Sequence, residues 1–216
     1  LDREVFLSLW IIIFAALAFS IGDAWQLDDP GSWWPLLWRT CALFALWCMA
    51  ASATYLLNDV RDRELDRLHP RKSRRPIASG QVSVGLATGL AVVLFAVSIP
   101  LAALLDAVAG GILLGYVIVM TAYSYGLKGV AILDIIILCT GVIGRAVAGA
   151  VAIDVEISPW LYVCSSFGAF FFASSKRWAE FRQLGAEAAR HRPSMAGYSG
   201  DILGQMVTIS AAAALL

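Results

Sequence analysis

Residues 58–66 read NDVRDRELD, and they follow an apolar run at 36–57 with no proline or glycine between the two. We expect one helix to run through both, so that the acidic segment is still helical where it leaves the apolar run. At about 100° per residue, Asp59, Asp62 and Asp66 fall within about 60° of one another around such a helix. Three carboxylates therefore share one helix face at the boundary of the apolar segment.

An acidic face of this kind needs a compensating cation, because like charges on one helix face repel. Magnesium prefers oxygen ligands and is usually shared between a few carboxylates and substrate phosphates. We therefore predict that Asp59, Asp62 and Asp66 are the ligands of Mg2+ and the catalytic residues, with the carboxamide of Asn58 beside them. Taken alone, the segment also fits a solvated acidic helix end.

A strongly basic loop, HPRKSRRPIASG at residues 69–80, comes directly after the acidic face. Pro70 is expected to end the helix, because the residue before a proline disfavours the helical conformation. Basic side chains beside a carboxylate–metal cluster suit a phosphorylated substrate, since Lys or Arg takes up the phosphate charge that the metal leaves. The loop also fits an orientation signal for a membrane protein, and the two interpretations are compatible.

The rest of the chain is far more apolar than a soluble domain. Hydrophobic residues make up 60% and charged residues 15% of the sequence, and the mean hydropathy is +0.76. A bilayer needs roughly 20 apolar residues in a helix that crosses it, and runs of about that length lie at 5–21, 36–57, 82–105, 107–124, 130–153, 159–175 and 202–216. Seven such runs leave too little polar sequence to cover a soluble core, so we predict an all-α, polytopic membrane bundle.

The distribution of charge predicts the orientation of this bundle. Thirteen of the sixteen Lys and Arg residues lie in three predicted loops, at 58–81, 125–129 and 176–200. The loops that alternate with them along the chain, at 22–35, 100–106 and 154–158, contain none. The positive-inside rule then places the acidic segment at the cytoplasmic face of the cell membrane. The net charge of zero says nothing about partners, and we expect no nucleic acid among them.

The acidic motif and the loop after it resemble a known family. Asn-Asp-x-x-Asp-x-x-x-Asp at 58–66, followed by Arg-Pro-Ile-Ala-Ser-Gly at 75–80, is similar to the UbiA superfamily of intramembrane prenyltransferases. The resemblance implies a bundle of about nine transmembrane helices around a central cavity, with about seven of them in this sequence. We expect residues 1–216 to form a single domain of this type, truncated at both ends. Family members move prenyl groups from diphosphates to aromatic acceptors, with magnesium between two aspartate-rich loops.

The loop after the sixth apolar run departs from that pattern, because it contains no aspartate between residues 155 and 200. Instead it carries Lys176-Arg177-x-x-Glu180, then His-Arg-Pro at 191–193 and Tyr-Ser at 198–199. These residues resemble one branch of the superfamily, the decaprenyl-phosphate phosphoribosyltransferases. The same branch is matched by Tyr-Ser-x-x-Leu-Lys at 123–128, by Leu-Asp at 133–134 and by Gly-x-x-x-Arg-Ala-x-Ala-Gly at 141–149.

This resemblance implies the Mg2+-dependent transfer of a 5-phosphoribosyl group from 5-phosphoribosyl 1-diphosphate to a polyprenyl (decaprenyl) phosphate. The donor diphosphate would bind with its magnesium on the three aspartates, steadied by Asn58. Lys72 and Arg75 would bind the diphosphate or the 5-phosphate of the donor, and Lys176 and Arg177 the phosphate of the acceptor. The remaining substrate-binding residues implied by the matched motifs are Tyr123, Lys128, Arg145 and Glu180.

Arg145 stands inside a predicted span, where an arginine costs about 2.5–3.5 kcal/mol on insertion scales and normally faces a partner or a polar cavity. The acid nearest to it in its own run is Asp134, eleven residues earlier and roughly 16 Å away along a helix. Arg145 therefore either binds phosphate or steadies the aspartate cluster, or it forms an ion pair with another helix.

Two other functions remain open on the sequence. One is a prenyltransferase of the same fold that moves a prenyl group from a polyprenyl diphosphate to an aromatic acceptor. The other is a lipid-binding or transport membrane protein without catalysis, which would explain the spans but not three aspartates on one face beside a basic loop.

Overall fold

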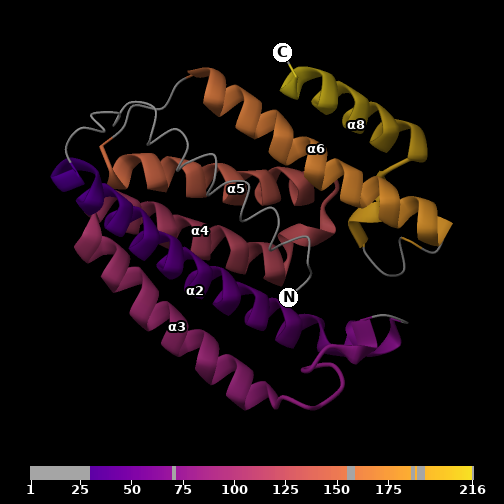
Figure 1. Cartoon of the computed structure of the whole chain (residues 1–216). Coiled ribbons are helices and arrows are strands. Elements are labelled where there is room, and N and C mark those ends of the chain that lie inside the picture. The colour runs from indigo at the N-terminus through magenta and orange to yellow at the C-terminus, as the bar shows by residue number, and fades with distance from the viewer. Residues whose placement is uncertain (1–29, 70–71, 155–158, 186–187, 189–192, 216) are drawn as a thin grey trace.

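The computed structural model describes residues 30–69, 72–154, 159–185, 188 and 193–215, and these residues form a bundle of helices (Figure 1). The first predicted span, 5–21, lies outside the described residues. The long helices are α2 (Pro30–Leu68), α3 (Val84–Leu105), α4 (Ala107–Tyr125), α5 (Leu133–Ala152), α6 (Pro159–Leu184) and α8 (Gly200–Ala214). Short 3₁₀ turns lie between them, at η1 (Lys72–Arg74), η2 (Leu127–Gly129) and η4 (Pro193–Gly197). The predicted all-α fold class is confirmed.

Helix α2 joins the apolar run and the acidic segment in one continuous helix of 39 residues, as the sequence predicts. It ends at Leu68, shortly before Pro70. The three aspartates therefore stand on the last turns of a helix whose middle turns, around Trp47 and Ala50, are buried in the bundle.

Four described helices are long and apolar enough to cross a membrane: Trp34–Leu68 of α2, and α3, α4 and α5. They correspond to the predicted spans at 36–57, 82–105, 107–124 and 130–153. The other two described spans fall in α6, which continues into the charged segment after Ser175, and in α8, which has 15 residues. These two helices are not among the four, so the number of seven spans stays a prediction.

Two apolar clusters hold the bundle together. The first lies between α2, α3, α4 and α5, around Trp47, Leu113 and Ala148. The second lies between α5, α6, η4 and α8, around Ile135 and Leu203. Figure 1 shows α5 between these two groups of helices. Outside the clusters, large aliphatic side chains such as Leu86, Val92 and Leu104 of α3 are exposed, as expected for a face in contact with lipid.

The basic connections gather at one end of the bundle. Figure 1 shows the C-terminal end of α2, the α4–α5 connection and the C-terminal end of α6 at the same end. This is the arrangement that the alternation of basic and non-basic loops predicts for helices that cross a membrane once each. The candidate site is therefore built from three segments that are distant in the sequence.

Candidate functional site

The aspartates of α2 are compensated by cations from two other segments. Nη1 of Arg75 donates to Oδ1 of Asp59 at 2.7 Å and to Oδ2 of Asp66 at 3.0 Å. Lys128 forms an ion pair with Asp62, and its Nζ donates to Oδ1 of Asn58 at 3.5 Å. The shared helix face predicted for the aspartates is thus present, and the structure shows that Arg75 and Lys128 neutralise its charge.

The loop after α2 folds back to bring Arg75 onto the acidic face. Ser79 N–H donates to the carbonyl of Arg75 at 2.8 Å, and Gly80 closes the turn with φ +84°, a conformation that favours glycine. Ile77 and Ala78 are buried, and Nε of Arg67 on α2 donates to the carbonyl of Ala78 at 3.0 Å. The Arg-Pro-Ile-Ala-Ser-Gly motif is therefore a tight turn that anchors Arg75.

Lys72, the other basic residue predicted for this loop, lies in η1 and is half-buried. Its positive charge lies close enough to Asp59 to interact electrostatically with that carboxylate. The structure therefore places Lys72 beside the same cluster, as the sequence predicts.

Lys128 reaches the acidic face from η2, in the α4–α5 connection. The connection ends at Ile132, whose φ of +70° is strained for a β-branched residue. Its N–H donates to the hydroxyl of Tyr198 at 2.5 Å. A Cβ on Gly197 would lie 2.6 Å from Cβ of Ala131, so the two segments are packed closely. The η4 segment thus supports the connection that carries Lys128.

A second polar cluster lies under this connection, at the start of α5. Asp134 is fully buried and accepts three hydrogen bonds: from Nε of Arg177 at 2.9 Å, from Oγ of Ser194 at 3.1 Å and from the hydroxyl of Tyr198 at 2.7 Å. Burial raises the pKa of Tyr198 above its ordinary value, and the hydrogen bond to Asp134 acts in the same direction. Tyr198 therefore stays a neutral donor.

Arg177 and Glu180 are held in this buried cluster. Nη1 of Arg177 donates to Oε2 of Glu180 at 3.1 Å, and only 6% of Arg177 is exposed. The sequence assigned Arg177 to the phosphate of an acceptor, but the structure engages its guanidinium with two carboxylates. Its neighbour Lys176 is half-buried, with Nζ 4.6 Å from the ring centroid of Phe172, so the two adjacent cations occupy different environments.

Arg145 lies well away from the aspartates. Nη2 of Arg145 donates to the hydroxyl of Tyr116 at 3.1 Å, and its guanidinium lies 5.2 Å and 5.8 Å from the ring centroids of Tyr116 and Trp47. Trp47 precedes Asp59 by twelve residues on α2, or about 18 Å of helix. The structure therefore does not bring Arg145 to the aspartate cluster. Within the described residues it also has no carboxylate partner, so aromatic rings stabilise its charge instead of the ion pair that the sequence left open.

Tyr123, also predicted as a substrate-binding residue, is buried near the C-terminal end of α4. Ser194 and Tyr198 were not predicted as site residues. Tyr198 belongs to a motif that the family resemblance matches, whereas no sequence pattern pointed to Ser194. Their common hydrogen-bond partner, Asp134, becomes evident only in the folded chain.

The donor set on α2 fits a divalent cation that prefers oxygen. The carboxylates of Asp59 and Asp66, seven residues apart, already converge on one cationic atom, Nη1 of Arg75. Within the described part of the chain, no three acidic, histidine or cysteine side chains meet at one point. The three predicted ligands are thus not assembled at one point, because Asp59 and Asp66 converge while Asp62 pairs with Lys128. Magnesium is usually held by one or two carboxylates together with waters and substrate phosphates, so Asp59 and Asp66 can share one ion with Asp62 beside them.

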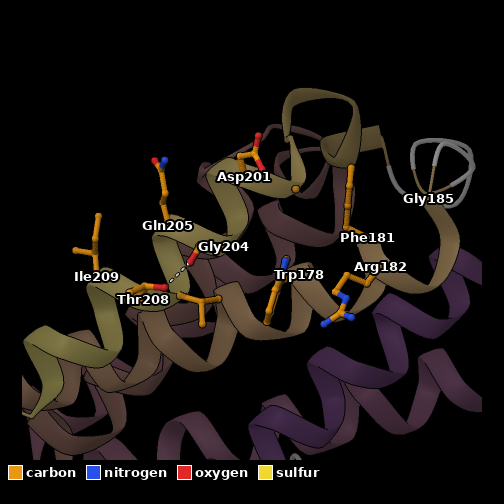
Figure 2. A pocket seen from close by; sticks show the side chains of 11 residues that line it. Trp178, Phe181, Arg182, Gly185, Asp201, Gly204, Gln205, Thr208 and Ile209 are labelled. Carbon is orange, nitrogen blue, oxygen red and sulfur yellow. Dashed lines mark hydrogen bonds between the residues drawn. The ribbon is translucent and has the colours of Figure 1, made fainter.

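A separate groove of about 1030 Å³ lies between α6 and α8. Figure 2 shows Trp178 and Phe181 of α6 on its floor, with Arg182 beside them; the guanidinium of Arg182 is 5.2 Å from the Trp178 ring centroid. The groove is lined by Trp178, Phe181, Arg182, Gly185, Gly200, Asp201, Gly204, Gln205, Val207, Thr208 and Ile209. None of the predicted site residues lines it, so it is distinct from the acidic face.

The chain is similar to known proteins over most of its length. The model of the UbiA prenyltransferase family matches residues 11–216. The decaprenyl-phosphate phosphoribosyltransferase of Mycolicibacterium smegmatis is 36% identical over 203 residues, or 94% of this chain and 63% of that protein. The protein of the same name from Corynebacterium glutamicum is 41% identical over 175 residues, or 80% of this chain and 53% of that protein.

A solved structure has the same fold. The UbiA homolog from Archaeoglobus fulgidus bound to DMAPP and Mg2+ matches with a TM-score of 0.72 at 18% identity, over 95% of this chain and 71% of that one. This chain spans less than two thirds of the length of each of the two phosphoribosyltransferases named above. Together with the four apolar helices, the family match makes this a multi-pass membrane protein.

Proposed function

Because this chain belongs to the UbiA prenyltransferase family, we propose that it forms the donor-binding part of an enzyme that acts on a diphosphate. The donor is 5-phosphoribosyl 1-diphosphate, and the acceptor is a polyprenyl (decaprenyl) phosphate. The named relatives at 36% and 41% identity support this branch of the family. So does the segment after α6, which in this sequence holds no second aspartate-rich motif.

One observation carries the proposal: anionic and cationic side chains from three segments meet on the last turns of α2. Asp59, Asp62 and Asp66 supply oxygen ligands, while Arg75 and Lys128 supply cations at hydrogen-bond distance from them. A metal–diphosphate needs both kinds of group, oxygen for the metal and cations for the phosphate oxygens. A lipid-binding or transport protein has no need of this combination.

The reaction breaks the bond between carbon 1 of the ribose and the diphosphate oxygen. A new bond forms between that carbon and a phosphate oxygen of the acceptor. The diphosphate leaves with the electron pair of the broken bond, and when bound, Mg2+ supplies positive charge that neutralises it. Arg75, Lys72 and Lys128 orient the diphosphate and neutralise its remaining charge by fixed electrostatics. The acceptor phosphate is already an anion, so the step needs no strong general base.

The acceptor phosphate lies near the charged C-terminal part of α6, which begins after Ser175. Lys176 is the residue that we propose to bind it, because its neighbour Arg177 is held by Asp134 and Glu180. The polyprenyl chain then lies among the apolar helices. The three basic connections support a site at the cytoplasmic face of the cell membrane, by the positive-inside rule.

The direct test is a donor assay on the full-length protein in membranes. Labelled 5-phosphoribosyl 1-diphosphate with decaprenyl phosphate is expected to give a labelled lipid that depends on Mg2+. In a parallel reaction, a labelled prenyl diphosphate with an aromatic acceptor is expected to give no product. Prenyl transfer without phosphoribosyl transfer would replace this function with that of an aromatic prenyltransferase.

A further inference from the structure

We propose that this site takes up a divalent metal and a diphosphate as one unit and holds either of them alone only weakly. Arg75 and Lys128 are the residues responsible, because they serve first as counter-ions of the aspartates and then as donors to the diphosphate. The proposal rests on the proposed function only in that a diphosphate is the ligand. It holds whichever group is attached to that diphosphate.

The first step is a competition for the same carboxylates. Nη1 of Arg75 fills the point at which Asp59 and Asp66 converge. A metal that takes both carboxylates therefore requires the guanidinium to move away. Lys128 holds Asp62 in the same manner, so metal binding competes with an internal cation at each of the three aspartates.

The second step is that both cations are free to leave α2 without unfolding it. Arg75 belongs to the turn after η1, and Lys128 belongs to η2 between α4 and α5. Their side chains are 32% and 23% exposed, so water or a phosphate can solvate them once they move. Arg177 in the buried cluster is only 7% exposed at its side chain and lacks this freedom.

The third step follows from the pairing of charges. A metal bound alone takes the aspartates away from Arg75 and Lys128 and leaves these two cations without counter-ions. A diphosphate bound alone is repelled by the negative charge of the aspartates. When both bind, the metal pairs with the carboxylates and the diphosphate pairs with the metal and the two released cations. Each ligand therefore strengthens the other, and a coupling of this kind typically amounts to roughly 5- to 150-fold in affinity.

The experiment measures metal binding directly, with Mn2+ as the probe followed by electron paramagnetic resonance. Full-length protein in lipid nanodiscs is titrated with Mn2+ in the presence and absence of inorganic diphosphate, and the complex formed in buffer is subtracted. In the wild type we expect diphosphate to tighten Mn2+ binding by at least about fivefold. Equal Mn2+ affinity with and without diphosphate would overturn the proposal.

Variants separate the two roles of the cations. Arg75→Gln and Lys128→Gln are expected to bind Mn2+ alone several times more tightly than the wild type, and to lose most of the tightening by diphosphate. Arg75→Lys keeps a cation at the site, so its affinity for Mn2+ alone should stay near that of the wild type. Arg182→Gln, a cation that lies over Trp178 away from the site, is the matched control and should leave both affinities unchanged.

The direction of the change decides between this mechanism and a simpler one. If Arg75 and Lys128 only supported the fold of the site, their removal would weaken Mn2+ binding, and that result would refute the proposal. A wild type that shows the coupling but transfers no phosphoribosyl group would leave the proposal intact. In that case only the proposed donor and acceptor would be wrong.

Discussion

The two acid–base clusters at this end of the bundle contain the same kinds of side chain but differ in burial. On α2, Asp59 and Arg75 form an ion pair whose side chains are 27% and 32% exposed, while Asp66, the second carboxylate on Arg75, is 5% exposed. At the start of α5, Asp134 and Arg177 form an ion pair whose side chains are 0% and 7% exposed. Water and ligands can therefore reach Arg75, Lys128, Asp59 and Asp62 in the first cluster, whereas the second cluster is closed to them.

The difference explains why one cluster suits binding and the other suits architecture. Ion pairs that water can reach are screened and contribute less to stability than buried ones, so replacing the partners of the first cluster costs less. A buried pair depends on its partner, because removal of one member leaves a buried charge without compensation. Asp134 joins α5, α6 and the segment around η4 through Arg177, Ser194 and Tyr198, and so it fixes the connection from which Lys128 reaches the acidic face.

The largest expected effect is therefore on stability, at the buried cluster. Asp134→Ala should destabilise the fold by about 3–5 kcal/mol, since Arg177 would remain buried without its main partner. Thermal unfolding of the purified protein in detergent measures this effect. Asp201→Ala, at an exposed acid in the first turn of α8, is the control and should change the transition little. An unchanged transition for Asp134→Ala would show that the two clusters do not differ as described.

The second effect is on activity, at the cluster on α2. Asp59→Asn, Asp62→Asn and Asp66→Asn should each lower turnover by about two to three orders of magnitude, as removal of one catalytic electrostatic group typically does. The thermal transitions of Asp59→Asn and Asp62→Asn should stay close to that of the wild type, because both side chains are partly exposed. Asp66→Asn should also lower the transition, because the Asp66 side chain is buried. Glu64→Gln, at an exposed acid of the same helix that pairs with Arg67, should keep its activity. Wild-type magnesium-dependent turnover in two of the three aspartate variants would mean that the metal site is misplaced.

Much of this arrangement follows from sequence patterns with a local cause. The continuous helix from the apolar run into the acidic segment is fixed by uninterrupted helical residues and by Pro70, and the shared face of the aspartates follows from helical spacing. The common end of the three basic connections follows from the alternation of charge between loops. These features need no knowledge of how the helices pack.

The pairing of individual cations was not accessible in the same way. Lys176 and Arg177 are adjacent in sequence and look equivalent, but only the position of Asp134, 43 residues before Arg177, decides that Arg177 is buried. The aromatic partners of Arg145 on α2 and α4 likewise depend on helix packing. Contacts between distant segments set these roles, and local spacing carries no record of them.

The third prediction uses the two adjacent cations to sharpen the comparison. A charge-assisted contact contributes roughly 1.5–3 kcal/mol, so Lys176→Ala should raise the KM for polyprenyl phosphate by about one to two orders of magnitude if ground and transition states are bound equally. Its thermal transition should change little. Arg177→Ala should instead lower thermal stability, because it leaves the buried carboxylate of Asp134 without its cationic partner. Acceptor kinetics and thermal unfolding on the two variants measure both effects, and an unchanged acceptor dependence for Lys176→Ala would reject its role.

The smallest expected effect concerns the hydroxyl of Tyr198, which accepts from Ile132 and donates to Asp134. Tyr198→Phe keeps the ring but leaves both groups short of one hydrogen bond, so the fold should lose about 1–2 kcal/mol. Burial raises the pKa of Tyr198 in the folded protein. A raised folded-state pKa contributes stability that is fully present below the ordinary tyrosine pKa of about 10 and is lost as pH rises through the folded value.

The difference in thermal stability between wild type and Tyr198→Phe should therefore be constant from pH 6 to about pH 9. It should shrink at more alkaline pH, because Tyr198 then ionises in the unfolded chain while the folded wild type still keeps its proton. Tyr162→Phe, at an exposed tyrosine of α6, is the matched control and should follow the wild type throughout. Because Tyr198 supports the connection that carries Lys128, the same variant should also weaken the tightening of Mn2+ binding by diphosphate. If Tyr198→Phe lost stability but kept the tightening of Mn2+ binding, the cluster around Asp134 would hold the fold without positioning the cluster on α2.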